Sequence, residues 1–72
     1  MKIKQMSQRQ ALNYLADTYG VGTTFVSGGH VASAKGIQAV FLDRRGLDGP
    51  RWAISIYSGE HAHLVDRINV SE

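Results

Sequence analysis

The run from Ile37 to Leu42 constrains the fold more than any other stretch, because it is the densest apolar segment of the sequence. In a β-strand, successive side chains point to opposite faces of the sheet. One face of this strand would carry Ile37, Ala39 and Phe41, and the other would carry Val40 and Leu42. A strand that is apolar on both faces is predicted to be a central strand, with both of its faces needing cover.

The size of the chain limits how such a sheet can be stabilised. With 72 residues, the sequence predicts one small α+β domain over residues 1–72. A single core of this size rarely supplies more than about 3–5 kcal/mol. Cysteine is absent, so disulfide bonds and thiolate zinc sites cannot add stability. A well-packed core, self-association or a metal site without cysteine remain as ways to stabilise the fold.

Residues 7–19 have the pattern of an amphipathic helix. Ser7 is a favourable N-cap residue, and Gln10 follows it at the spacing of a capping box. Gly20 can adopt the left-handed conformation that ends many helices. The spacing predicts one apolar face that contains Leu12, Leu15, Ala16 and Tyr19, with Ala11 beside it.

The middle of the chain is rich in strand signals. β-Branched and aromatic residues predict strands over 23–27, 30–33, 37–44 and 52–57, with Gly28-Gly29 as the turn between the first two. The segment 30–33 also fits an irregular loop, and residues 1–6 fit either a short strand or a tail. Glycine, proline and an Asp-Gly pair predict a loop over 45–51.

Residues 61–70 fit either a strand or a helix, and the strand is favoured. A three-residue loop at 58–60 would set Ile54 opposite Leu64, and Asp66 would interrupt an otherwise apolar face. The predicted fold is therefore α+β, with an N-terminal helix packed on one face of a small antiparallel β-sheet of three to five strands.

The pairing between the strands over 37–44 and 52–57 stays open at this point. Either Leu42 or Phe41 would lie opposite Ile54, and the two registers differ by one residue. A slip of one residue exchanges the two faces of a strand.

One helix of this length can cover only one face of the sheet. Val40 and Leu42 would then remain on the other face, and Tyr57 or Val65 could join them. A contiguous apolar surface rimmed by polar residues is typical of a contact surface. Alternatively, the N-terminal residues or the 45–51 loop would cover this face, or a second copy of the chain would do so in a homodimer.

The predicted loop over 45–51 is basic. Arginine can bind phosphate and tryptophan can stack on an unpaired base, and both residue types also anchor protein interfaces. Against these interpretations, the local carboxylates could pair with the arginines in a solvated turn, and Trp52 fits the core-facing alternation of its strand. The residues concerned are Arg44, Arg45, Arg51 and Trp52, with Asp43 and Asp48 among them.

The sequence offers little catalytic chemistry. His61 and His63 could share one side of a strand and bind a metal, but exposed histidines on an edge strand are the favoured interpretation. The carboxylates are scattered, and no glycine pattern matches a phosphate loop. We therefore predict no enzyme, no catalytic residues, no cofactor and no metal.

These observations predict a non-catalytic binding module: a small regulatory or inhibitory protein, of the kind found in phages and mobile elements, that acts by protein–protein contact. The partner would be another protein or a second copy. The alternative is a nucleic-acid-binding module that uses the hairpin 44–52, although a formal net charge of +2 decides nothing. The candidate partner-binding residues are Val40, Leu42, Arg44, Arg45, Arg51, Trp52 and Tyr57.

The same sequence predicts a cytoplasmic protein that contacts no membrane and takes no small-molecule substrate. No apolar run is long enough to span a bilayer. The N-terminal residues also lack the apolar segment of a signal peptide.

Overall fold

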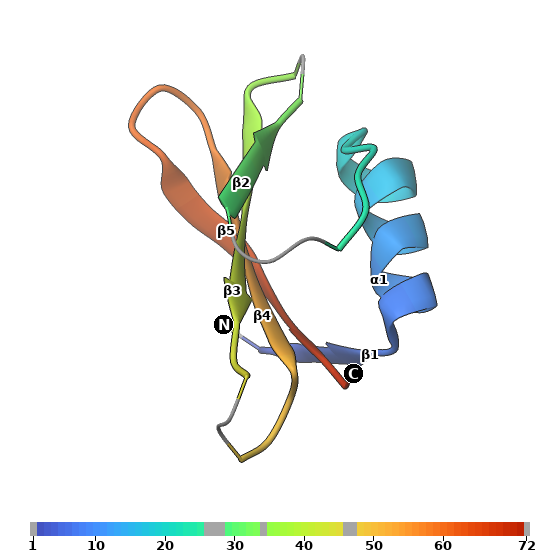
Figure 1. Cartoon of the computed structure of the whole chain (residues 1–72). Helices are drawn as coiled ribbons and strands as arrows, with labels where there is room; N and C mark the ends of the chain where they lie inside the picture. The colour runs from blue at the N-terminus through green and yellow to red at the C-terminus, as the bar shows by residue number, and fades with distance from the viewer. Residues whose placement is uncertain (1, 26–28, 34, 46–47, 72) are drawn as a thin grey trace.

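A helical segment lies against one face of a five-stranded sheet in the computed structural model, which describes residues 2–25, 29–33, 35–45 and 48–71 (Figure 1). The helical segment is α1 (Gln8–Tyr14), continued by a π-helical turn, η1 (Leu15–Tyr19). The strands are β1 (Lys4–Met6), β2 (Gly29–Ala32), β3 (Ile37–Asp43), β4 (Trp52–Ser58) and β5 (His63–Val70). The predicted α+β class, with an N-terminal helix on one face of a small sheet, is confirmed.

The strand order across the sheet is β1-β5-β4-β3-β2, so β4 is the middle strand and β3 lies beside it. Three neighbouring pairs are antiparallel, but β1 and β5 are parallel, with Lys4 beside Ile68 and Met6 beside Val70. The prediction of an antiparallel sheet is therefore wrong for this one pair. Parallel pairing joins segments that are distant in the sequence, so no local pattern in residues 1–6 could indicate it.

The start of the helical segment follows its sequence signals. The Ser7 side chain accepts a hydrogen bond from the Gln10 backbone N–H (3.2 Å), and the Gln10 side chain accepts one from the Ser7 backbone N–H (3.1 Å). This reciprocal pair is the predicted capping box. At the other end, Gly20 adopts the predicted left-handed conformation, with φ of 69°.

The apolar face of the helical segment differs from the prediction. Ala11 and Leu15 are buried, but Ala16 is exposed. The reason is the π-helical turn, whose wider winding brings residues five apart to the same side, whereas an α-helix would place them about 140° apart. Tyr14 and Tyr19 therefore lie together on the side facing the sheet, with ring centroids 5.8 Å apart.

The sheet face that α1 covers, called here the inner face, holds the core. Phe41 lies opposite Ile54, which selects one of the two registers left open by the sequence. The segment after the helix supplies one more buried residue, Val21. The buried apolar residues are Ala11, Leu15, Val21, Ile37, Ala39, Phe41, Trp52, Ile54, Ile56, Ile68 and Val70.

The segment before β2 differs from the prediction. A strand was expected over 23–27, but Thr23 to Phe25 do not belong to a strand, and Gly29 begins β2 instead of forming a turn. Residues 26–28, which include the rest of that predicted strand and turn, lie outside the described residues. The aromatic ring of Phe25 packs on Phe41 and Trp52, with centroid distances of 5.4 and 5.2 Å. Core packing therefore outweighs local strand preference here.

The strand interpretation of 61–70 is confirmed, but its register is not. The loop after β4 is longer than predicted, and Ser58 pairs with His63. Ile54 consequently lies opposite Ile68 and not opposite Leu64.

A β-bulge explains how β5 keeps its apolar residues inside. The register shifts between Ile56 and Tyr57, so that Tyr57 pairs with Leu64 and Ile56 pairs with Asp66. The extra residue, Val65, has no partner on β4. A bulge changes which face the following side chains occupy, and here it turns Asp66 toward the inner face.

Within the residues that the structure describes, no helix is both long enough and apolar enough to cross a bilayer.

Candidate contact surface

The sheet face opposite α1, called here the outer face, is the first candidate site. The strand alternation and the pairing of β3, β4 and β5 determine which residues it presents. They are Gln38, Val40, Leu42, Ala53, Ser55, Tyr57, Leu64, Arg67 and Asn69, with the bulged Val65 beside them.

This outer face carries exposed apolar side chains among polar ones, and no described element covers it. Leu42 is 58% exposed, Leu64 41% and Val65 44%. Of the elements that the structure describes, α1 and η1 pack on the inner face and none packs on the outer face (Figure 1). The alternative that the N-terminal residues or the β3–β4 loop cover this face finds no support in the described part of the chain.

The cross-strand pairs give the outer face a simple layout. Leu42 lies beside Ala53 at one end, and Tyr57 lies beside Leu64 at the other. Arg67 lies between these ends, opposite Ser55. From strand geometry, this surface is about 14 Å long and about 10 Å wide.

Trp52 was predicted to bind a partner, but it does not lie on an exposed surface. It points to the inner face and is 4% exposed. Its indole N–H has no hydrogen-bond acceptor among the described residues. The core-facing interpretation of Trp52 is therefore the one that the structure supports.

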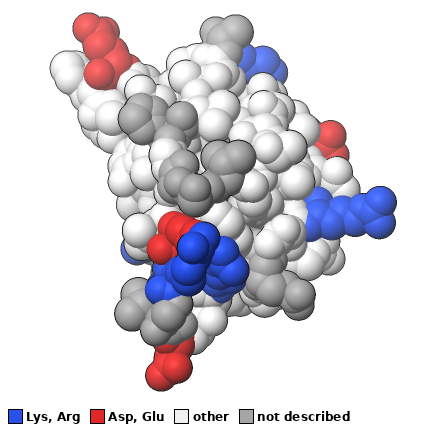
Figure 2. Space-filling view, in the orientation of Figure 1, with Lys and Arg blue, Asp and Glu red and all other residues white. Residues whose placement is uncertain are grey.

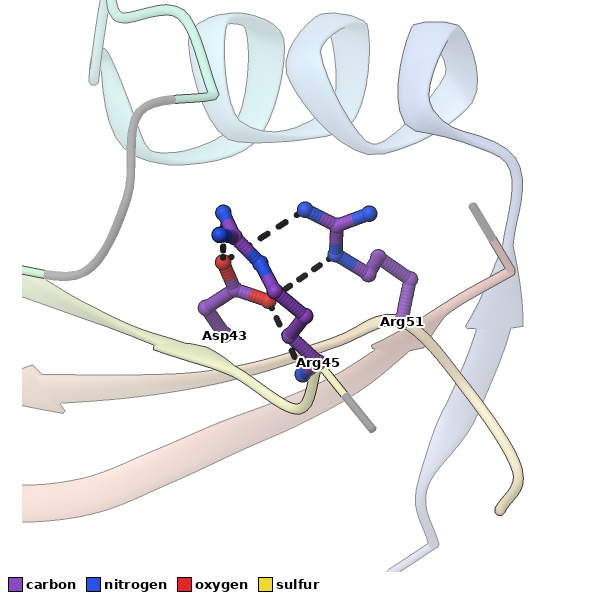
Figure 3. A network of polar contacts seen from close by, with 3 residues as sticks. All are labelled: Asp43, Arg45 and Arg51. Atoms are coloured by element: carbon purple, nitrogen blue, oxygen red, sulfur yellow. Dashed lines mark hydrogen bonds and ion pairs between the residues drawn. The ribbon is translucent and has the colours of Figure 1, made fainter. Parts of the chain in front are cut away.

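Arg45 and Arg51 form a cluster with Asp43 at the end of the inner face (Figure 3). The Arg51 Nε donates to the carboxylate at 2.9 Å, and Arg45 donates both its backbone N–H (3.1 Å) and a guanidinium N–H (3.2 Å). The Arg51 hydrogen bond holds the pKa of Asp43 below its ordinary value, against the opposing effect of burial. The predicted turn with local Arg–Asp pairs is therefore present.

This pairing limits the positive charge that the loop can offer. Figure 2 shows acidic and basic side chains side by side near the lower end of the molecule, where the β3–β4 loop lies. Arg44 differs from its neighbours, because its guanidinium donates to the backbone carbonyl of Asp48 at 3.2 Å and pairs with no described carboxylate. Arg45 and Arg51 share the single carboxylate of Asp43, so this cluster keeps one positive charge, and Arg44 adds a second.

An open depression of about 420 Å³ lies between this loop and the start of α1. It is lined by Ser7, Gln8, Arg9 and Arg51. Ser7 is already committed to the capping box and Arg51 to Asp43. The depression therefore lacks a set of free groups converging on one ligand.

Sequence reasoning missed a buried polar cluster around Asp66, which is 3% exposed. Tyr14 and Tyr19 donate their hydroxyl groups to one carboxylate oxygen, the latter at 2.8 Å. Lys4 Nζ and the Arg67 backbone N–H donate to the other, each at 2.9 Å. The cluster links η1 and α1 to β5 and β1.

The electrostatics of this cluster fit a structural role. Burial raises the pKa of Asp66, but hydrogen bonds from Tyr14, Lys4 and Tyr19 outweigh it and hold that pKa below its ordinary value. Burial and the same carboxylate raise the pKa of Tyr19. The one signal in the sequence was Asp66 itself, because it interrupts an apolar alternation. An aspartate that is buried in such a position requires hydrogen-bond partners.

His61 and His63 lie near the tip of the β4–β5 hairpin, with ring centroids 6.3 Å apart and both side chains exposed. The described residues contain no group of three or more histidine and acidic side chains arranged to hold a metal ion. A pair of exposed histidines alone does not make a metal centre.

Comparisons with protein-family models, with curated proteins and with solved structures found no match to this chain. What its surfaces bind is therefore inferred from their own geometry and chemistry.

Proposed function

We propose that this protein is a non-catalytic binding module whose outer sheet face contacts another protein. One observation carries the proposal: the outer face exposes Leu42 at one end and Leu64 and Val65 at the other, and no described element covers it. Fully burying a leucine or valine side chain is worth roughly 1.5–3 kcal/mol. A partner that covered this face would therefore gain most from these side chains.

A regulatory or inhibitory role fits this arrangement. A small chain that binds through one face can act by covering a surface that its partner needs. We also retain the cytoplasm as the proposed compartment, since the absence of cysteine is compatible with a reducing environment.

The nucleic-acid alternative has less support. Asp43 engages Arg45 and Arg51, and Trp52 lies in the core rather than on the hairpin surface. A phosphate-binding hairpin would instead need unpaired cations and an exposed stacking ring. This alternative serves as an outcome of the following experiment.

The test is a pull-down from a bacterial lysate with the tagged chain, with and without nuclease, at low and moderately high salt. Leu42→Asp and Leu64→Asp place a charge on the outer face. Asn13→Asp is the matched control, because Asn13 is exposed on α1. We expect the chain to retain a discrete protein through nuclease and salt. Asn13→Asp should retain the same protein, and both outer-face variants should lose it.

Two results would contradict the proposal. Equal retention by the outer-face variants would place the contact elsewhere. Recovery of nucleic acid whose binding is lost in salt and is weakened by Arg44→Ala would favour the hairpin 44–52 as the binding surface.

A further inference from the structure

We infer that the occupant of the outer face is an amphipathic helix of a partner protein that carries a carboxylate for Arg67. This inference rests on the proposed function and names the partner's chemistry. Three observations support it: the sign of the charge on the face, the pairing of its strands, and the way the inner face is already covered.

The first observation is the charge. Of the outward-facing residues of β3, β4 and β5, Arg67 is the only charged one. The carboxylates of these strands, Asp43 and Asp66, belong to the inner-face clusters. Arg67 is exposed and forms no ion pair with a described carboxylate. A surface that combines exposed apolar side chains with this one cation is complementary to a partner that combines apolar side chains with an acidic residue.

The second observation is that the outer face offers side chains and no free strand edge. β3, β4 and β5 each have a neighbouring strand on both sides. A partner on this face must therefore pack by side chains instead of adding a strand. A surface about 14 Å by 10 Å matches a helix, whose diameter is about 10–12 Å.

The third observation is the inner face of the same sheet. There, η1 and α1 donate Tyr19 and Tyr14 hydroxyl groups to an acid of β5, Asp66. The next residue, Arg67, presents the opposite charge to the other face. A helix on the outer face could complete a three-layer arrangement, with its carboxylate accepting two hydrogen bonds from the guanidinium.

A second copy of the chain fits this surface less well. In a symmetric face-to-face dimer, the same patch meets itself. A second copy would therefore bury two Arg67 guanidinium groups in one interface, at a cost in free energy. The patch offers no carboxylate to compensate.

The probe is a displayed library of helical peptides with a fixed leucine stripe and with Glu, Gln or Lys at the flanking positions. Peptides selected on the full chain are then measured by fluorescence anisotropy. We expect acidic peptides to be enriched. Arg67→Glu should weaken their binding at least about tenfold and should improve the binding of the Lys-flanked peptides. Arg9→Glu is the matched control, because Arg9 is exposed on α1, and it should leave binding unchanged.

The outcomes separate the two proposals. In one outcome, the selected peptides show no acidic preference and still lose binding with Leu64→Asp. That result would overturn the inference of an acidic helix and would still support the outer face as a contact surface. Peptide binding that Leu42→Asp and Leu64→Asp both leave intact would remove both proposals. A dimer in sedimentation that Leu64→Asp dissociates would assign the face to a second copy and overturn the inference.

Discussion

Asp66 places one carboxylate between the helical segment and two strands, and every donor around it comes from a different turn or strand position. Its partners are Lys4, Tyr14, Tyr19 and the backbone of Arg67. Removing a charge that several donors share leaves some of these donors without an acceptor.

Asp66→Asn should lower the free energy of unfolding by about 1–3 kcal/mol, because the amide cannot accept from all four donors. Urea unfolding followed by circular dichroism would measure this loss. Asp17→Asn is the control, since Asp17 is exposed on η1 and should change stability by no more than about 0.5 kcal/mol. Equal effects of the two substitutions would show that the cluster contributes nothing specific.

The same carboxylate predicts a pH dependence. The pKa of Asp66 in the folded protein lies below its ordinary value, which is about 3.9 in an unfolded chain. Its contribution is therefore fully present above about pH 4 and is lost as the pH falls through the folded pKa. The difference in unfolding free energy between the chain and Asp66→Asn should shrink below about pH 4. A difference that stays constant from pH 7 to 2 would contradict this assignment.

At the scale of the elements, the π-helical turn η1 has an identifiable purpose. It brings Tyr14 and Tyr19 onto one side, where both hydroxyl groups reach the same carboxylate oxygen. An uninterrupted α-helix would direct one of them away.

Tyr14→Phe and Tyr19→Phe should therefore be coupled. Each single change should cost about 0.5–1.5 kcal/mol, and the double change should differ from the sum by at least about 0.5 kcal/mol. A double-mutant cycle in urea unfolding measures this coupling. Additive effects would mean that the two tyrosines act independently and that the turn has another origin.

Local sequence signals were enough for some elements. The capping box at Ser7 and the helix end at Gly20 depend on neighbouring residues, and the inner faces of β3 and β4 follow simple alternation. The bulge at Val65, the π-helical turn and the parallel β1–β5 pair depend on contacts between distant segments. For the same reason, the sequence indicated a two-faced strand but not the position of Arg67 on the outer face.

At the scale of the whole molecule, the two faces of the sheet should respond very differently to substitution. Ile54→Ala removes a fully buried side chain, which costs about 2–5 kcal/mol, comparable to the about 3–5 kcal/mol that a core of this size supplies. Leu42→Ala, on the outer face, should change stability by no more than about 0.5 kcal/mol. Thermal unfolding would compare the two. A large loss with Leu42→Ala would show that the outer face is already covered.

The pairing of β1 with β5 also determines when the sheet can finish folding. During synthesis, β1 and α1 leave the ribosome before β5, which supplies both the strand beside β1 and the acid that binds the two tyrosines. The helical segment therefore waits with its inner side exposed until β5 has emerged. Closure of the fold therefore depends on contacts between segments that are far apart in the sequence, which form more slowly than local ones.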